Sequence, residues 1–291
     1  MAPNDQGFDH LDRPGRLVAR LAYAPGGIAY GAVFALVAAA WVLLTAMAAA
    51  LPVLSGGPGA RLLSLLPAVD LPPVFDALLA LCLEPVSPGA AGFAALAAMW
   101  FLMSVAMMLP SAAPLIRTYC EIADTAHAAE KTVAHPLWLV VGYLAVWFVI
   151  SLVYAGLGML AGGFAGSTAG LAPAAAPLAV AALAIAGLYQ FSGLKQACLV
   201  KCRNPFAILF ANWSARPAAI FRLGAVQGLW CFGCCWALML VMFAVGMMNV
   251  FWMALLAVFT LFEKSGSPLF LSRLAGAILL VWALAVLLVS G

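Results

Sequence analysis

The stretch "LGAVQGLWCFGCCWALMLVMFAVGMMNVFWMALLAVFTLF" (Leu223–Phe262) carries no charged residue and is predominantly apolar. A single helix of about 40 residues would be ~60 Å long, about twice the ~30 Å hydrocarbon thickness of a membrane. The run must therefore contain two helices and a turn between them. "VGMMN" (Val245–Asn249) supplies the turn residues Gly246 and Asn249. This stretch predicts an all-α protein that crosses a membrane.

The composition of the whole chain supports a membrane protein. Of 291 residues, 67% are hydrophobic and only 8% are charged, whereas a soluble domain carries roughly a quarter charged residues. Such a chain cannot cover a water-facing surface, so the lipid bilayer is its main solvent and first partner. The net charge of +3 is small and no basic block occurs, which excludes nucleic-acid binding.

The chain contains seven segments that are predicted to span the membrane. Residues 1–28 are expected to form a cytoplasmic N-terminal segment, and residues 29–291 a polytopic transmembrane helix bundle. The sixth segment is short for a span and suits a tilted or partly interfacial helix. The predicted helices cover about 29–51, 92–110, 137–160, 176–194, 222–246, 248–263 and 272–290.

The distribution of positive charge predicts the orientation of these helices. With the N-terminus inside, every Lys and Arg except Arg61 lies on the cytoplasmic side, as the positive-inside rule requires. The C-terminus is then outside. The polar N-terminus has no apolar core followed by a cleavage site, so the first helix is expected to act as the targeting signal. The outer loops are predicted at about 52–91 and 161–177.

Cysteines and methionines are concentrated in four motifs. On helix five, "GLWCFGCCWALM" places Cys231, Cys235 and Met242 on one face, with Gln227 and Cys234 at its edge and Met239 at the opposite edge. In "YQFSGLKQACLVKCRNP", the four-residue spacing directs both thiols to one face together with Lys195. The other two motifs are "MWFLMSVAMMLP", which Pro110 is expected to end, and "MMNVFWM".

Thiolate and thioether sulfur favour Cu(I) over hard cations, and thiolates also suit zinc. We expect a soft ion to enter past Met248, Met247 and Met242 and to bind the cysteines, with Lys195 offsetting their negative charge. The candidate metal ligands are Cys198, Cys202, Cys231, Cys234, Cys235, Met239, Met242, Met107 and Glu263. The polar residues expected to support them inside the bundle are Tyr189, Gln190, Lys195, Gln227 and Asn249.

Each candidate also has a simpler interpretation. Buried Met and Cys often only pack, a Cys234–Cys235 disulfide would be strained, and Glu263 fits a membrane boundary. His127 and His135 belong to an amphipathic segment that suits a solvated interfacial helix first and a metal site second. Cys82 and Cys120 occur singly and suit structural roles. No nucleophile elbow, P-loop or metalloprotease motif is present, so no catalytic residue is assigned.

Taken together, these motifs resemble a bacterial family of predicted metal-binding integral membrane proteins, a domain-of-unknown-function family. The resemblance covers roughly residues 95–264 and includes "GLWCFGCCWALM", "GMMNVFWM" and the terminal "EK". Members often have Pro at the position of Gly193, so the backbone there is expected to differ. The resemblance implies metal binding and a multi-pass location in the bacterial inner membrane.

Three functions are compatible with these observations. The first is binding of copper in the helix bundle, for transport or for delivery to a metal-accepting protein. The second is a membrane oxidoreductase that uses bound metal or thiol chemistry; the absence of His deep in the bilayer counts against a Cu(II) cofactor. The third is an assembly subunit whose cysteines only pack.

Overall fold

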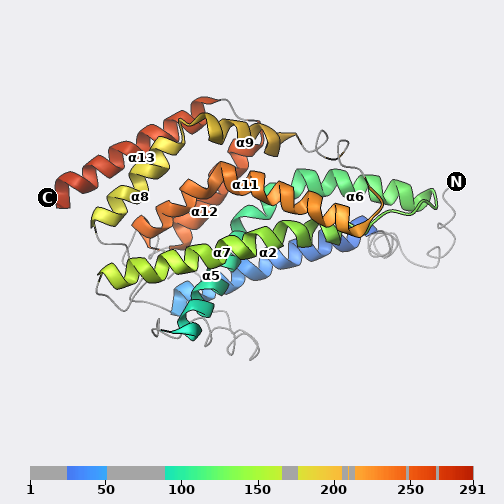
Figure 1. Ribbon diagram of the computed structural model, residues 1–291, viewed down its shortest axis with the longest axis horizontal. Coiled ribbons are helices and arrows are strands. Elements are labelled where there is room, and N and C mark those ends of the chain that lie inside the picture. The colour runs from blue at the N-terminus through green and yellow to red at the C-terminus, as the bar shows by residue number, and fades with distance from the viewer. Residues whose placement is uncertain are drawn as a thin grey trace.

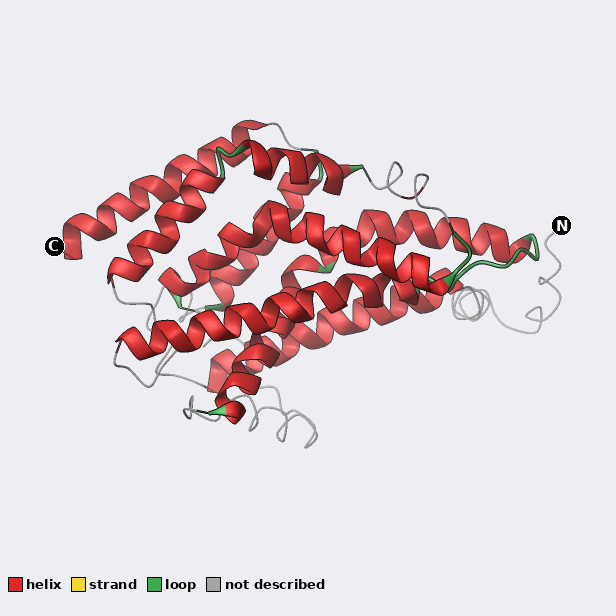
Figure 2. Cartoon of the chain, in the orientation of Figure 1, coloured by secondary structure: helices red, strands yellow, loops and turns green. Residues whose placement is uncertain are grey.

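The computed structural model describes residues 25–50, 89–165, 176–204, 209, 214–246, 249–266 and 269–290. Within these residues every regular element is a helix and no strand occurs (Figure 2), which confirms the all-α prediction. Most of the N-terminal segment 1–28 lies outside the described residues. So do most of the predicted outer loops, Cys82 and the pair Met247 and Met248.

The described helices correspond closely to the predicted segments. In chain order they are α2 (Pro25–Ala50), α5 (Ala90–Met108), the 3-10 turn η3 (Pro110–Ala112), α6 (Ala113–Ala128), α7 (Leu137–Ala165), α8 (Ala176–Tyr189), α9 (Gly193–Arg203), α11 (Pro217–Val245), α12 (Val250–Lys264) and α13 (Leu269–Ser290). The predicted helix end at Pro110 is confirmed, because α5 gives way there to η3.

Five described helical segments are long and apolar enough to span a membrane, and the bent pair α8 and α9 makes up to six. The predicted number was about seven. The difference lies in α12, which has 15 residues. A helix of that length rises about 22 Å, short of the ~30 Å hydrocarbon thickness. The predicted orientation of the helices stays a prediction.

The predicted fourth helix, 176–194, is broken. α8 ends at Tyr189, and α9 starts at Gly193 with its axis turned by 65°. Ser192 causes the restart because its hydroxyl accepts a hydrogen bond from the Lys195 backbone N–H over 3.1 Å, a typical helix N-cap. After the bend, α9 packs against α11 and α12.

The predicted turn between the fifth and sixth helices is present. α11 ends at Val245 and is followed by Gly246, whose φ of 93° lies in the left-handed region that glycine tolerates best. Asn249 then caps α12, accepting a hydrogen bond from the Trp252 backbone N–H over 3.3 Å. The long apolar stretch is therefore divided where its turn residues occur.

α11 is the central helix of the bundle (Figure 1). It packs against α7, α8 and α9, while α5 packs against α7 and α2, and α13 packs against α8. Trp100 of α5 stacks on Tyr154 of α7 at 4.6 Å between ring centroids and contacts Phe243 of α11 at 5.3 Å. This aromatic core fixes the relative positions of α5, α7 and the cysteine-bearing helix α11.

Candidate metal centre

Three thiols of α11 lie inside the bundle. Cys231, Cys234 and Cys235 are each 1% exposed. The Cys234 and Cys235 thiols donate hydrogen bonds to the Cys231 carbonyl over 3.0 and 2.9 Å. These bonds orient the two thiols in the metal-free protein, and each thiol that binds a metal ion gives up its proton.

α9 contributes a thiol to the same place. The Cys202 and Cys234 sulfur atoms are 3.9 Å apart and come from different helices. α9 approaches closely because α11 has Gly233 at the contact. A Cβ built on Gly233 would lie 2.6 Å from the Cys198 sulfur, and the Tyr189 hydroxyl donates a hydrogen bond to the Gly233 carbonyl. Both predicted cysteines of α9 therefore face α11, and Cys202 is the one that meets a thiol.

α5 adds a thioether. The Met108 sulfur lies 3.5 Å from the Cys235 sulfur, and Met108 is 1% exposed. We refer to Cys202, Cys231, Cys234, Cys235 and Met108 as the sulfur cluster. Three helices supply its members, so the cluster exists only in the folded bundle.

Polar groups surround one member of the sulfur cluster. The sulfur of Cys231 lies 3.0 Å from the Tyr143 hydroxyl, 2.9 Å from the Lys264 ammonium and 3.9 Å from the Ser111 hydroxyl. Lys264 also donates to Ser111 over 2.8 Å, and Tyr143 to the Met108 carbonyl over 2.8 Å. Lys264 therefore places a positive charge beside the sulfur cluster.

The spacing of two thiols in the sulfur cluster is compatible with both sulfur atoms binding one ion. Two sulfurs bound to one ion at about 2.3 Å each are roughly 3.8 Å apart at a tetrahedral angle, close to the 3.9 Å between Cys202 and Cys234. Within the described residues no group of three or more His, Cys, Asp or Glu is arranged to hold a metal ion. The thioether of Met108 and the pair of thiols are soft donors, which bind Cu(I) in preference to hard cations.

A second cluster of charged groups lies on the other side of the α12 C-terminus. The Lys195 ammonium is 2.8 and 2.9 Å from the two carboxylate oxygens of Glu263 and donates to the Gln190 side-chain oxygen over 2.5 Å. Ser272 donates to Glu263 over 2.5 Å, and Arg203 donates to the Glu263 backbone carbonyl over 3.0 Å. We refer to these five residues as the ion-pair network.

The ion-pair network changes the roles expected of two residues. Lys195 was expected beside the thiols, but its ammonium is directed to Glu263. The cation at the sulfur cluster is Lys264 instead. Glu263 was a candidate metal ligand, and both of its oxygens are occupied by Lys195 and Ser272. Glu263 and Lys264 reach different clusters because neighbouring residues of α12 point about 100° apart.

The remaining candidates do not join the sulfur cluster in the described part of the chain. Met107, Met239 and Met242 are fully buried, and no hydrogen bond joins them to the cysteines of the described segments. Gln227 is buried one turn before Cys231, and its side-chain oxygen has no hydrogen-bond partner within the described structure. Asn249 caps α12 instead of facing the thiols. The predicted burial of intramembrane polar groups is confirmed for Gln190, Lys195, Gln227 and Glu263.

Four residues of the site were not indicated by the sequence: Met108, Ser111, Tyr143 and Lys264. Met108 adjoins the candidate Met107, and Lys264 adjoins the candidate Glu263. In both pairs, the residue that joins the site depends on which side of its helix faces α11. α5 is buried on most sides, and the exposed side of α12 is itself apolar, as at Phe251 and Phe262. The hydrophobic pattern therefore does not show which side faces the site.

A model of the PpoB2 family, described as copper chaperone, matches residues 97–286. This chain belongs to the PpoB2 copper chaperone family. No curated protein and no solved structure matches the chain. The match begins close to the start of the resemblance predicted at 95–264 and extends beyond its end into α13. Every member of the sulfur cluster and of the ion-pair network lies within the matched PpoB2 region.

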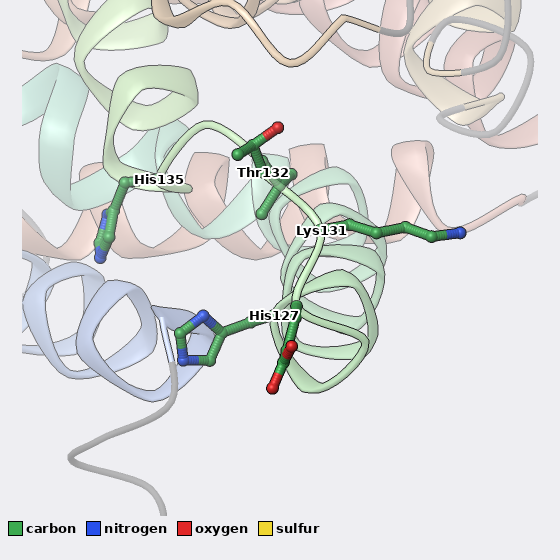
Figure 3. Close-up of a pocket in the computed structure, with 6 residues that line it drawn as sticks. His127, Lys131, Thr132 and His135 are labelled. Atoms are coloured by element: carbon green, nitrogen blue, oxygen red, sulfur yellow. The ribbon is translucent and has the colours of Figure 1, made fainter.

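The PpoB2 region also includes two histidines, His127 in the last turn of α6 and His135 in the loop before α7. They line an open cavity of about 540 Å³ together with Glu130, Lys131, Thr132 and Val133. Figure 3 shows the His127 and His135 rings on the same side of the connecting loop, while Lys131 points away from them. This arrangement agrees with the first interpretation, a solvated segment, and separates the histidines from the sulfur cluster.

Proposed function

We propose that this PpoB2 family member binds Cu(I) as its cargo between α9 and α11 and passes the ion to a copper-requiring protein. Cys202 and Cys234 are the primary ligands, and Cys231, Cys235 and Met108 are neighbouring sulfur donors. The observation that carries the proposal is the convergence of thiols from two helices at 3.9 Å, next to a thioether from a third.

The arrangement of the sulfur cluster suits release as well as binding. Cys202 is half-buried at the edge of the bundle, whereas Cys231, Cys234 and Cys235 are each 1% exposed. An incoming thiol or thioether of an acceptor can therefore replace Cys202 first, while Cys234 still holds the ion. Exchange of one ligand at a time avoids free copper, and this favours delivery over transport through the bundle.

Lys264 balances the charge of the loaded site. Two thiolates and one Cu(I) carry a net negative charge, which is costly in a buried position unless it is paired. The Lys264 ammonium, 2.9 Å from the Cys231 sulfur, supplies the opposite charge. The Tyr143 hydroxyl lies 3.0 Å from the same sulfur.

The proposal places the protein in the bacterial inner membrane as a multi-pass protein. The apolar helices support a membrane location. A metal-donating or metal-accepting protein is the expected partner, since a copper chaperone acts between two other copper-binding sites.

Anaerobic Cu(I) titration of the purified protein in detergent tests this proposal. With a chromogenic Cu(I) chelator as competitor, wild type should retain copper, and Cys202→Ser/Cys234→Ser should lose at least ~100-fold in affinity, because both primary ligands are gone. Cys120→Ser is the matched control, since Cys120 is a buried cysteine of α6 away from the sulfur cluster. Equal affinity in all three proteins would refute the proposed site, and a preference for zinc in parallel titrations would change the cargo.

A further inference from the structure

We infer a second activity for the sulfur cluster: the Cys202 and Cys234 dithiol reduces cupric ion to cuprous ion and closes as a disulfide between α9 and α11. The inference deepens the proposed function, because it names Cu(II) as a form in which the cargo is accepted. It is carried by the position of two thiols on separate helices, 3.9 Å apart.

The geometry allows this bond to form without rearranging the bundle. A disulfide needs its sulfur atoms about 2.05 Å apart, so the pair must close by roughly 1.9 Å. Cys202 is in the last turn of α9, a helix of 11 residues that follows the 65° bend. Rotation of the Cys202 side chain with a small shift of this short helix can supply the movement.

The other described thiols are less suited to pair. Cys235 is directed to Met108, whose thioether cannot form a disulfide. Cys231 faces the Lys264 ammonium and the Tyr143 hydroxyl. Cys198 packs against Gly233. A bond between the adjacent Cys234 and Cys235 would be strained.

The reaction balances with two cupric ions for each disulfide. Each thiol gives up one electron and one proton, each Cu(II) gains one electron, and the two sulfur atoms join. The products are one disulfide, two Cu(I) and two protons, which leave at the half-exposed edge beside Cys202. Because the disulfide takes up both primary ligands, the cuprous ions pass to an acceptor or a chelator, and the binding site returns when the dithiol is restored.

Reduction of the disulfide restores the dithiol. A thiol of an external dithiol reductant attacks the Cys202 sulfur, which is the more accessible of the two, and Cys234 leaves as a thiolate. The second thiol of the reductant then releases Cys202. A reversible redox pair requires one sulfur that a reductant can reach and a second sulfur that leaves as a thiolate. Cys202 and Cys234 meet these two requirements.

The test uses full-length reduced protein in detergent under anaerobic conditions. Two equivalents of a copper(II) salt are added, the Cu(II) signal is followed by electron paramagnetic resonance, and disulfides are mapped by mass spectrometry after alkylation. Wild type should remove both equivalents of Cu(II) and yield a Cys202–Cys234 cross-linked peptide. Cys198→Ser, the matched control on the same helix, should behave as wild type. Cys202→Ser and Cys234→Ser should leave at least half of the Cu(II) signal.

Two results would overturn the inference: an unchanged Cu(II) signal in wild type, or a disulfide that maps to other cysteines. Peptide mapping of wild type does not depend on whether any variant folds. The Cu(I) titration of reduced protein shows whether a negative result contradicts this inference or the proposed function. Wild type that binds Cu(I) but leaves Cu(II) unreduced fails the inference alone. Wild type that forms the disulfide but does not bind Cu(I) fails the proposed function.

Discussion

Two neighbouring residues at the end of α12 belong to two different kinds of site. Glu263 points into the ion-pair network, where Lys195 and Ser272 occupy both of its carboxylate oxygens. Lys264 points into the sulfur cluster, where its ammonium meets Cys231. The carboxylate and ammonium of the ion-pair network satisfy each other. The sulfur cluster has soft donors that contact one another through weak hydrogen bonds.

The ion-pair network and the sulfur cluster have different roles in the same bundle: the first holds helices together, and the second can bind a ligand. A buried ion pair whose groups are all paired has little left to offer a ligand, so the ion-pair network fixes how α9, α12 and α13 assemble. Thiols and thioethers make poor hydrogen bonds and strong bonds to soft metals. The sulfur cluster is therefore the part of the bundle with unused binding capacity.

Removal of the carboxylate should give the largest effect on stability. Glu263→Leu leaves the Lys195 ammonium buried without its counter-charge, and loss of one partner of a buried pair costs about 3–5 kcal/mol of unfolding free energy. The double variant Lys195→Met/Glu263→Leu should recover most of this loss. Denaturant unfolding in mixed micelles measures both. A stability unchanged from wild type, together with lost Cu(I) binding, would show that the two regions are one site.

A larger residue at the α9 contact should weaken copper binding next most strongly. Gly233→Val places a side chain where the Cys198 sulfur lies, which moves α9 away from α11 and separates Cys202 from Cys234. Overpacking of this kind costs about 1–3 kcal/mol, and we expect at least ~10-fold weaker Cu(I) affinity. Gly156→Val is the control, because a Cβ there meets nothing within 4 Å. Unchanged affinity would mean that Cys202 is not a ligand.

Neutralising the cation of the sulfur cluster should have an intermediate effect. Lys264→Met removes a charged hydrogen bond worth about 1.5–3 kcal/mol, and at least ~10-fold of Cu(I) affinity should be lost as the loaded site keeps an unpaired negative charge. Lys201→Met, an exposed position on α9, is the control for a change of net charge. Tighter binding in Lys264→Met would reverse the assigned role, since the ammonium would then compete with copper.

Substitution of the thioether should have the smallest effect. Met108→Leu keeps the volume but removes the sulfur next to Cys235, and we expect a few-fold loss of Cu(I) affinity, since soft thiolate ligands remain. Met107→Leu, one residue earlier and equally buried, should leave the affinity unchanged. The anaerobic Cu(I) titration with a competing chelator measures the affinity of both variants. A larger loss in Met107→Leu would restore the ligand originally predicted from the sequence.

The sequence predicted the helical fold well because that prediction depends on length and polarity alone. Apolar segments of sufficient length gave α2, α5, α7, α8, α11, α12 and α13, whereas α6 and most of α9 lie outside these segments. Gly246 with Asn249 marked the break between α11 and α12. The bend before α9 was not predicted. It depends on the local cap at Ser192, within an apolar segment that was expected to stay one helix.

The site was predicted in its chemistry and only partly in its membership. The cysteines of α9 and α11 were chosen from spacing along one helix, and they do face each other. Met108 and Lys264 depend on how α5 and α12 are rotated about their axes, which a uniformly apolar helix does not encode. The intended partner of Lys195 was also misassigned, because Glu263 is 68 residues away in the chain and only the fold brings them together.

The adjacency of Glu263 and Lys264 makes α12 intolerant of a change in length. Insertion or deletion of one residue between Asn249 and Glu263 would rotate the end of the helix by about 100°. Glu263 would leave Lys195, and Lys264 would leave Cys231, in the same event. A substitution at either position damages one region, whereas a single-codon insertion is expected to damage both. Among natural variants of this chain, we therefore expect α12 to vary in sequence but to keep its number of residues.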